Sequence, residues 1–186
     1  MKIMLDIETL GVTTTAQVIQ IGAVAEDSST FISYIAPDTS AERFSTDVDT
    51  LLWWNGDVVR EAMITDIFLT GQPIEQELKR FADWMFSKHP TEVWAKGASF
   101  DLAILSYAFR QCGVNQPWVF RQERCFRTYA NMFSPDYVKR LAAVDANKQP
   151  HNALADAQHQ MALLQRLEAA SEMLLVNLKA ANDGAH

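Results

Sequence analysis

The chain has 186 residues, is 48% hydrophobic and 21% charged, and carries a formal net charge of −7. These values are ordinary for a globular protein, and the length is enough to bury a full core, so we expect a single domain over residues 1–186. The acidic balance argues against a broad basic surface that wraps long nucleic acid, but it leaves room for an enzyme that holds a few nucleotides through bound cations.

Targeting signals are not evident in the sequence. The first residues, MKIMLDIET, lack the apolar core of a signal peptide, and no apolar run approaches the ~18 residues of a membrane span, so no membrane association is expected. The two cysteines, Cys112 and Cys125, have no metal-ligand spacing. We therefore expect reduced thiols and a cytoplasmic location.

The N-terminal part of the chain is rich in Val and Ile that alternate partly with other residues, a pattern typical of strands. Three strands are predicted here, over residues 2–6, 17–27 and 29–37. Asp27, Ser28 and Ser29 favour a hairpin turn between the second strand and the third, and Pro37 ends the third. The chain therefore opens with an antiparallel meander.

Helical patterns alternate with short strands in the rest of the chain. Thr46 or Asp47 has helix-start character, Ser99 is a candidate cap, and Gly113 is a candidate stop. Helices are predicted over residues 46–56, 73–89, 99–113 and 152–178, short strands over 91–97 and 124–128, and a polar loop over 145–150. This order predicts an α/β fold, a mixed central sheet of about five strands with helices packed on it.

Four acids stand out by their places in these elements. Asp6 and Glu8 fall at and just beyond the end of the first strand, two residues apart and therefore on one face. Asp101 lies in the first turn of its helix, where the helix dipole stabilises negative charge, and Asp156 lies one turn into the last helix. Taken alone, each acid has an ordinary interpretation as a first-turn or water-facing residue.

Apolar neighbours weaken that interpretation for three of the acids. Asp6 follows IML, Asp101 lies within FDLAIL, and Asp156 lies within HNALADA. Carboxylates inside apolar stretches are costly without partners, so bound cations or hydrogen bonds are expected around them. A ligand set made only of oxygen atoms suits Mg²⁺ or Mn²⁺.

Three segments in chain order, D-I-E-T-x-G, F-D-x-x-I-L and H-N-A-L-x-D-A, resemble the three exonuclease motifs of the DEDD 3′→5′ exonuclease superfamily. The histidine five residues before the last aspartate is similar to that of the DEDDh branch, which includes RNase T and the proofreading subunit of DNA polymerase III. Within that branch, the segment TLLWWNGD resembles phage and prophage exonucleases and the RNase AS group, which implies a bacterial cell or a phage-infected host.

The resemblance implies an RNase H-like fold and a 3′→5′ exonuclease that hydrolyses single-stranded DNA or RNA to nucleoside 5′-monophosphates by a two-metal-ion mechanism. It also implies two divalent cations, Mg²⁺ or Mn²⁺. Asp6, Glu8 and Asp156 would hold one ion, with Asp6 bridging to a second ion that Asp101 supports. His151 would be the general base that takes a proton from the attacking water, whereas without the motif it would be interpreted as a water-facing residue.

Contacts to the 3′-terminal nucleotide are implied by the same resemblance. The backbone near Thr9 would meet the terminal sugar, and Leu10 would wedge against bases, with plain packing as an equal alternative. Phe100 would stack on a base or pack in the core. Of the adjacent Trp53 and Trp54, Trp54 is expected to stack on a base, while core packing is open for at least one of the two rings.

One position departs from the resemblance, because many relatives have Asn where this chain has Lys96. Lys96 would meet a phosphate if it points into the cleft, and a family contact would be missing if it points to solvent. Two alternatives remain for the function. One is an exoribonuclease acting on RNA 3′ tails; the other is an inactive nucleic-acid-binding module, which the presence of all five catalytic positions argues against. A homodimer, common among relatives, is compatible with the sequence.

Overall fold

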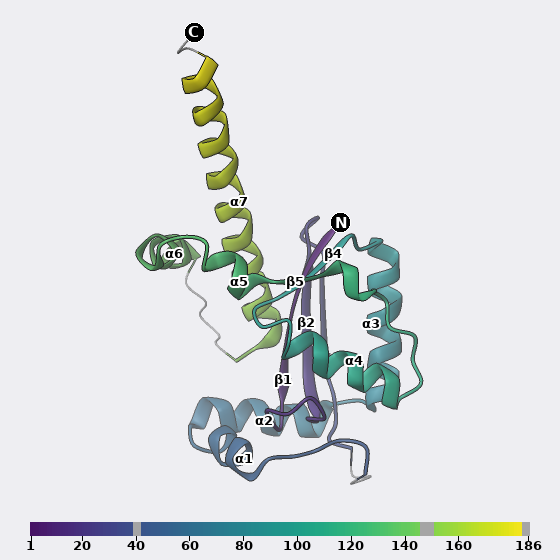
Figure 1. Ribbon diagram of the computed structural model, residues 1–186. Coiled ribbons are helices and arrows are strands. Elements are labelled where there is room, and N and C mark those ends of the chain that lie inside the picture. Colours follow the sequence, from purple (N-terminus) through teal and green to yellow (C-terminus); the bar gives the residue numbers. More distant parts are fainter. Residues whose placement is uncertain (39–41, 146–150, 184–186) are drawn as a thin grey trace.

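The computed structural model describes residues 1–38, 42–145 and 151–183. Within these ranges a five-stranded sheet runs in the order β3-β2-β1-β4-β5 (Figure 1). The strands are β1 (Lys2–Thr9), β2 (Val18–Ala25), β3 (Thr30–Tyr34), β4 (Glu92–Ala95) and β5 (Glu123–Cys125). Because β1 pairs antiparallel with β2 and parallel with β4, the predicted mixed sheet of an α/β fold is confirmed.

The first three strands form the predicted antiparallel meander. Its turn lies where the sequence predicts it, since Ser28 has a φ of 67° and the Asp27 carboxylate accepts the backbone N–H of Ser29 at 2.9 Å. Strand β1 extends further than predicted, to Thr9, because its ladder to β2 continues through the pair Glu8 and Gln20. The acids of β1 therefore lie within the strand and not at its end.

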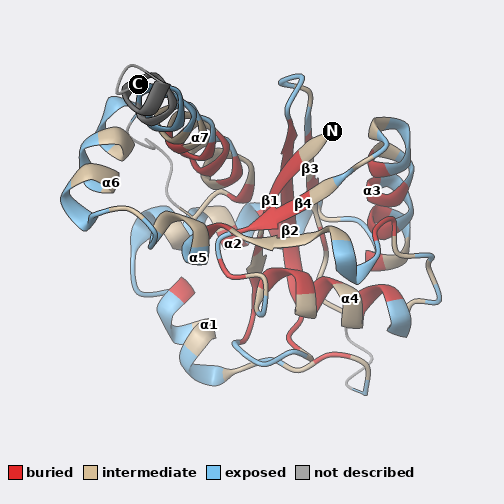
Figure 2. Cartoon of the chain, turned by 45° about the horizontal axis from the view of Figure 1, so that its top comes forward, coloured by how far each residue is buried: buried red, intermediate tan, exposed pale blue. Residues whose placement is uncertain are grey.

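Helices cover both faces of the sheet. They are α1 (Val48–Trp54), α2 (Val58–Thr70), α3 (Ile74–Lys88), α4 (Asp101–Gln111), α5 (Phe126–Ala130), α6 (Pro135–Ala142) and α7 (Ala153–Asp183), with 3-10 turns η1 (Phe120–Gln122) and η2 (Ala143–Asp145). Helices α3 and α4 lie on one face, and α5, α6 and α7 lie on the other, while α1 and α2 lie across one end (Figure 1). Figure 2 shows the buried residues concentrated in the strands and on the sheet-facing sides of these helices.

Alternation along β1 explains how one strand serves both faces. Ile3 and Leu5 pack into the core cluster that contains α3 and α4, whereas Met4 packs into the cluster that contains α7. Successive side chains of a strand point to opposite faces, so Asp6 and Glu8 share the face of Met4. The two acids of the first motif therefore point to the side of the sheet that α7 covers.

Helix α7 confirms the long C-terminal helix predicted from the sequence. Its apolar stripe, which includes Ala157, Met161 and Leu164, is buried against the sheet. Its later part extends away from the sheet (Figure 1), and there Met173 and Leu174 are 68% and 61% exposed. No helix in the described ranges is both long and apolar enough to cross a membrane.

Some helix ends agree with the sequence prediction and others differ from it. The Asp47 carboxylate caps α1 by accepting the N–H of Asp49 at 2.8 Å, and Gly113 follows α4 with a φ of +62°, so these two signals are confirmed. The predicted Ser99 cap is wrong, because Phe100 occupies the N-cap of α4 and makes no side-chain cap. The predicted loop over 145–150 lies, apart from its first residue, outside the described residues.

Helices α2, α5 and α6 were not expected from the sequence. The β-branched residues of α2, VVREAMITDIFLT, have low helix propensity, although its cap Asp57 accepts the N–H of Val59 at 2.8 Å and is a readable start signal. The strand predicted over 124–128 is wrong in its second half, since β5 ends at Cys125 and α5 starts at Phe126. Helices as short as α5 carry little periodic signal.

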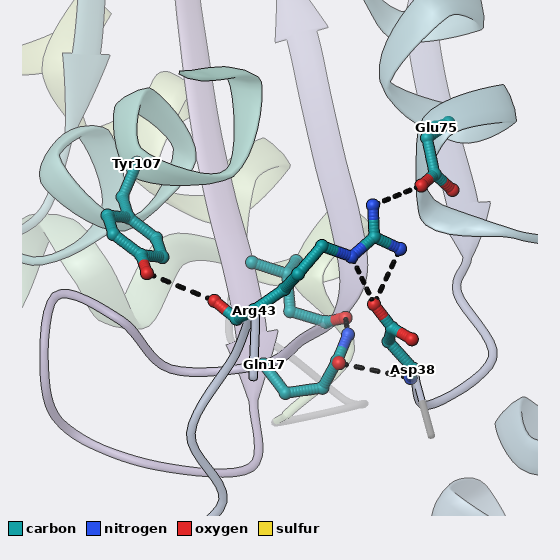
Figure 3. Close-up of polar contacts among 6 residues, drawn as sticks. Gln17, Asp38, Arg43, Glu75 and Tyr107 are labelled. Atoms are coloured by element: carbon teal, nitrogen blue, oxygen red, sulfur yellow. Dashed lines mark hydrogen bonds and ion pairs between the residues drawn. The ribbon is translucent and has the colours of Figure 1, made fainter. Parts of the chain in front are cut away.

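A cluster of polar side chains holds Asp38 and Arg43, which follow β3, against the α3–α4 side of the molecule (Figure 3). Arg43 forms ion pairs with Asp38 and Glu75, and the Tyr107 hydroxyl donates to the backbone carbonyl of Arg43 at 3.0 Å. The Gln17 side-chain carbonyl accepts the backbone N–H of Asp38 at 3.1 Å. These contacts fix the chain immediately before α1, the helix that borders the site.

Candidate active site

Three of the predicted acids come together between β1 and α7. Oxygen atoms of Asp6, Glu8 and Asp156 all lie within 4.8 Å of one another, and each of the three residues is half-buried. Asp6 and Glu8 reach this place because they share one face of β1. Asp156 reaches it because the first turn of α7 lies against that face. This grouping is the set that would hold a single ion.

The start of α7 is held against β2 at close range. The backbone N–H of Ala153 donates to the side-chain carbonyl of Gln20 at 2.6 Å. A Cβ atom on Gly22 would lie only 2.1 Å from the backbone nitrogen of Leu154, so only glycine allows this approach. The helix therefore meets the sheet backbone to backbone, and this contact sets the position of Asp156 relative to β1.

Asp101 lies near these acids but outside the group of three. It is 5% exposed, and its carboxylate accepts backbone N–H groups that include those of Ile7 and Gly97. These bonds tie the first turn of α4 to β1. The carboxylate thus has a fixed position from which it faces the other acids and raises the pKa of both Asp6 and Glu8.

Burial raises the pKa of Asp6 to about 8 and the pKa of Glu8 to about 9, and the neighbouring acids add to both shifts. Burial also raises the pKa of Asp101 to about 6, although backbone N–H groups and the charge of Arg127 oppose the shift. Desolvation and like charge both disfavour the ionised form of a carboxyl group. Carboxyl groups gathered in this way are characteristic of functional sites and suit a cation that would offset their charge.

A cavity of about 290 Å³ contains these acids, and the lining also includes His151. The backbone N–H of His151 donates to a carboxylate oxygen of Asp156 at 2.9 Å. His151 has a φ of 66°, a left-handed conformation that is uncommon for residues other than glycine. All five predicted catalytic residues therefore lie in one cavity.

Gln160 is a site residue that the sequence interpretation missed. Its side-chain N–H donates to Oδ1 of Asp6 at 2.9 Å, and its Oε1 is buried without a hydrogen-bond partner among the described residues. The signal was present, because Gln160 follows Asp156 by four residues and such residues share a helix face. Gln160 also lines the cavity of the acids and therefore belongs to the same site.

Two cations line the same cavity, namely Lys96 after β4 and Arg127 in α5. Lys96 thus faces the cleft, where its charge lowers the pKa of Asp6. The sequence does not point to Arg127 as a site residue, because the strand that it predicts over 124–128 carries no motif. Both side chains bring positive charge to the cavity of the acids.

A second cavity, of about 500 Å³, adjoins the first and shares Ile7, Glu8 and Phe100 with it. Thr9 and Trp53 also line it, and the Thr9 hydroxyl donates to the backbone carbonyl of Gly11 at 2.6 Å. Thr9 and Phe100 therefore both line a cavity that adjoins the acids.

The other two predicted substrate contacts need correction. Leu10 is 3% exposed and packs in the core cluster with Ile19 and Trp54, so the structure favours plain packing over a wedge between bases. Trp54 is 1% exposed, and its indole N–H donates to the carbonyl of Thr9 at 3.0 Å. Stacking on a base needs an exposed ring, which Trp54 lacks; its neighbour Trp53 is 40% exposed and contacts His151 instead.

This sheet, with α7 laid against β1, has the RNase H-like fold of DEDDh exonucleases, as two solved structures show. The nuclease domain of 3′hExo, a DEDDh family member bound to rAMP, has a TM-score of 0.60 and 16% identity, with 90% of this chain and 92% of that chain covered. Product-bound exonuclease I has a TM-score of 0.60 and 11% identity, with 89% of this chain and 44% of that chain covered.

The family model for the 3′-5′ exoribonuclease Rv2179c-like domain matches residues 1–167. The chain therefore belongs to the Rv2179c-like family and is a 3′-5′ exonuclease, which confirms the resemblance inferred from the three motifs. A comparison with curated proteins finds no match.

Proposed function

We propose that the chain removes nucleotides from the 3′ end of single-stranded nucleic acid and releases nucleoside 5′-monophosphates, with divalent cations held by Asp6, Glu8 and Asp156. The observation that carries this proposal is the approach of these three carboxylates to within 4.8 Å in a cavity that also contains His151. Hydrolysis would break the bond between the scissile phosphorus and the 3′ oxygen of the preceding nucleotide.

The residues present fit a divalent cation. The grouped side chains supply only oxygen ligands, as Mg²⁺ and Mn²⁺ prefer. Burial and then the neighbouring acids raise the pKa of Asp6 and Glu8, and a bound cation would oppose both effects. Asp101, which lines the same cavity, would support a second ion. When bound, a pair of such cations polarises a phosphate and stabilises the charge on the leaving oxygen.

His151 would act as the general base. Its ring lines the cavity of the acids, and its backbone is held by the carboxylate of Asp156 at 2.9 Å. A histidine in this place would take one proton from the attacking water as the new bond to phosphorus forms. Asp156 thus has two roles in the proposal, as a ligand and as the anchor of the base.

The two cavities would divide the substrate. The first contains the cations Lys96 and Arg127, which suit the phosphate of the upstream chain. The second is lined by Thr9, Trp53 and Phe100 and, within the described residues, by no Lys or Arg. It suits the terminal nucleoside, which has no further phosphate beyond the scissile one. The substrate strand would then enter across α5, and its 3′ end would lie beside α1.

RNA is the substrate we favour over DNA. The family is described as exoribonuclease, and the 3′hExo nuclease domain is bound to rAMP. The test compares matched single-stranded RNA and DNA oligonucleotides, each labelled at the 5′ end and offered with either a free or a phosphorylated 3′ end. We expect stepwise shortening of the free-ended RNA in Mn²⁺ and none in EDTA. Equal internal cleavage of the oligonucleotides with a free 3′ end and of those with a phosphorylated 3′ end would contradict an exonuclease.

An inactive binding module of the same fold would bind the oligonucleotide without shortening it, so the same assay separates the two functions.

Four features stay predictions: the preference for Mg²⁺ or Mn²⁺, the single domain over residues 1–186, the homodimer and the cytoplasmic location.

A further inference from the structure

The backbone hydrogen bond of His151 does not by itself fix the orientation of its imidazole ring. The hydrogen bond from its backbone N–H to Asp156 fixes the main chain but leaves the imidazole free to turn about its side-chain bonds. A φ of 66° costs a residue with a side chain ~1–3 kcal/mol, so this conformation persists only where the surroundings hold it. Whatever holds the ring decides where the proposed base points.

Trp53 is the aromatic residue against that ring. The centroids of the two rings lie 4.8 Å apart, and their planes are inclined at 85°, an edge-to-face contact. Such pairs contribute ~0.5–1.5 kcal/mol beyond the area that they bury. The contact joins the last turn of α1 to His151, two residues before α7, so a remote segment of the chain reaches the site.

Trp53 is itself held from two sides. On one side Trp54 meets it edge to face, with centroids 5.2 Å apart, and Trp54 is anchored by its hydrogen bond to the carbonyl of Thr9. On the other side the guanidinium carbon of Arg60 lies 4.2 Å from the centroid of the Trp53 ring. Trp53 is therefore a fixed surface, although 40% of it is exposed.

Arg60 is held in position for its contact with Trp53. It lies in the first turn of α2, where the Asp57 carboxylate accepts its backbone N–H at 3.3 Å. The Nε atom of Arg60 is buried and has no hydrogen-bond partner in the described part of the chain, as expected for a guanidinium plane laid on an indole ring. A chain of contacts thus runs from Arg60 through Trp53 to His151.

We propose that Trp53 is a positioning residue that orients the imidazole of His151, with Arg60 acting through Trp53, and that Trp53 is not a stacking platform for a nucleobase. The catalytic consequence rests on the proposed function, but the contact itself does not. The α1–α2 segment thereby sets the direction of the base, and truncation of Trp53 slows the chemical step more than it weakens substrate binding.

The first test observes the imidazole directly in the full chain, without added metal. Histidine is labelled at Cε1, and the His151 signal is identified by its loss in His151→Asn. Trp53→Leu is expected to shift that signal, because the ring current of the indole is removed, while the signals of His89 and His159 stay in place. Phe68→Leu is the matched control, since Phe68 is an aromatic residue of α2 with a similar exposure of 42%. A His151 signal that does not move in Trp53→Leu overturns the proposal.

The second test uses kinetics with single-stranded RNA and Mn²⁺. Trp53→Leu is expected to lower kcat by up to ~100-fold with KM little changed, as for a misplaced catalytic group. Trp53→Phe is expected to restore most of kcat, and Arg60→Leu to lower kcat less than Trp53→Leu does. A rise in KM at unchanged kcat would overturn the proposal in favour of base stacking. If the unaltered protein shows no activity, the proposed function fails, while the histidine spectra still decide whether Trp53 holds His151.

Discussion

The side-chain carbonyl of Gln20 accepts the backbone N–H of Ala153 at 2.6 Å, and so joins the middle of β2 to the first residue of α7. This N–H belongs to the first turn of the helix, where backbone donors have no partner within the helix. Gln20 is fully buried and pairs with Glu8 of β1 across the sheet. One side chain of β2 thereby joins the helix that carries Asp156 to the neighbour of the strand that carries Asp6 and Glu8.

Replacing Gln20 with Met keeps the volume and removes the acceptor. We expect Gln20→Met to lower the free energy of unfolding by about 1–3 kcal/mol, because a buried N–H loses its partner. Urea unfolding followed by circular dichroism measures this. An unchanged midpoint at an unchanged slope would show that the bond does not hold α7.

Gly22→Ala tests the close approach of α7 to β2. The added Cβ would lie 2.1 Å and 2.2 Å from backbone atoms of Leu154 and Ala153, which have no flexible end that can give way. We expect a protein that unfolds at a clearly lower temperature or does not fold. Gly97→Ala is the control, since its nearest neighbour would be 3.6 Å away and the melting temperature should barely change. Equal melting temperatures for both variants would contradict the packing described here.

The acids predict how stability depends on pH in the absence of divalent cations. Burial raises the pKa of Asp6 to about 8 and of Glu8 to about 9, so at neutral pH the folded protein holds protons that the unfolded chain has released. The folded state is thus favoured at low pH, and this contribution is lost as pH rises from about 4 toward 8 or 9. Melting temperatures in EDTA should fall across that window.

The variant Asp6→Asn/Glu8→Gln supplies the comparison for that slope. It removes both titrating groups and should make the melting temperature less dependent on pH than in the unaltered protein. A slope that is the same in the two proteins would mean that other groups cause it.

Gln160 should tune the affinity for the cation. Its N–H bond to Asp6 lowers the pKa of that carboxyl, so Gln160→Leu should make the carboxylate harder to ionise and weaken Mn²⁺ binding at neutral pH by ~10-fold or more. Isothermal titration calorimetry with Mn²⁺ measures this. Gln158→Leu, at an exposed position of the same helix, is the matched control and should bind like the unaltered protein.

Much of this architecture could be predicted from the sequence because the signals are local. Alternation of apolar residues marks the strands of the meander, and the spacing of Asp6 and Glu8 places both on one face. The apolar stripe of α7 marks the longest helix in the same way. Where a periodic pattern or a motif spans the element, prediction and structure agree.

The remaining features depend on contacts between distant segments. Nothing in the adjacent letters of Trp53 and Trp54 tells which ring is buried, since that depends on where the carbonyl of Thr9 lies. Arg127 enters the site because α5 begins directly after β5, and a five-residue helix has no readable period. Gln160 faces Asp6 only once α7 is docked on β1.

The proposed active site is tested most directly by the release of nucleoside 5′-monophosphate from the 3′ end of single-stranded RNA in Mn²⁺, measured for the unaltered protein and for Asp6→Asn. Asp6 is half-buried beside Glu8 and Asp156, and loss of its charge should leave the fold intact and not lower the melting temperature. We predict stepwise release by the unaltered protein and a loss of ~1000-fold in Asp6→Asn. Undiminished release by a folded Asp6→Asn protein would contradict the claim that these carboxylates form the active site.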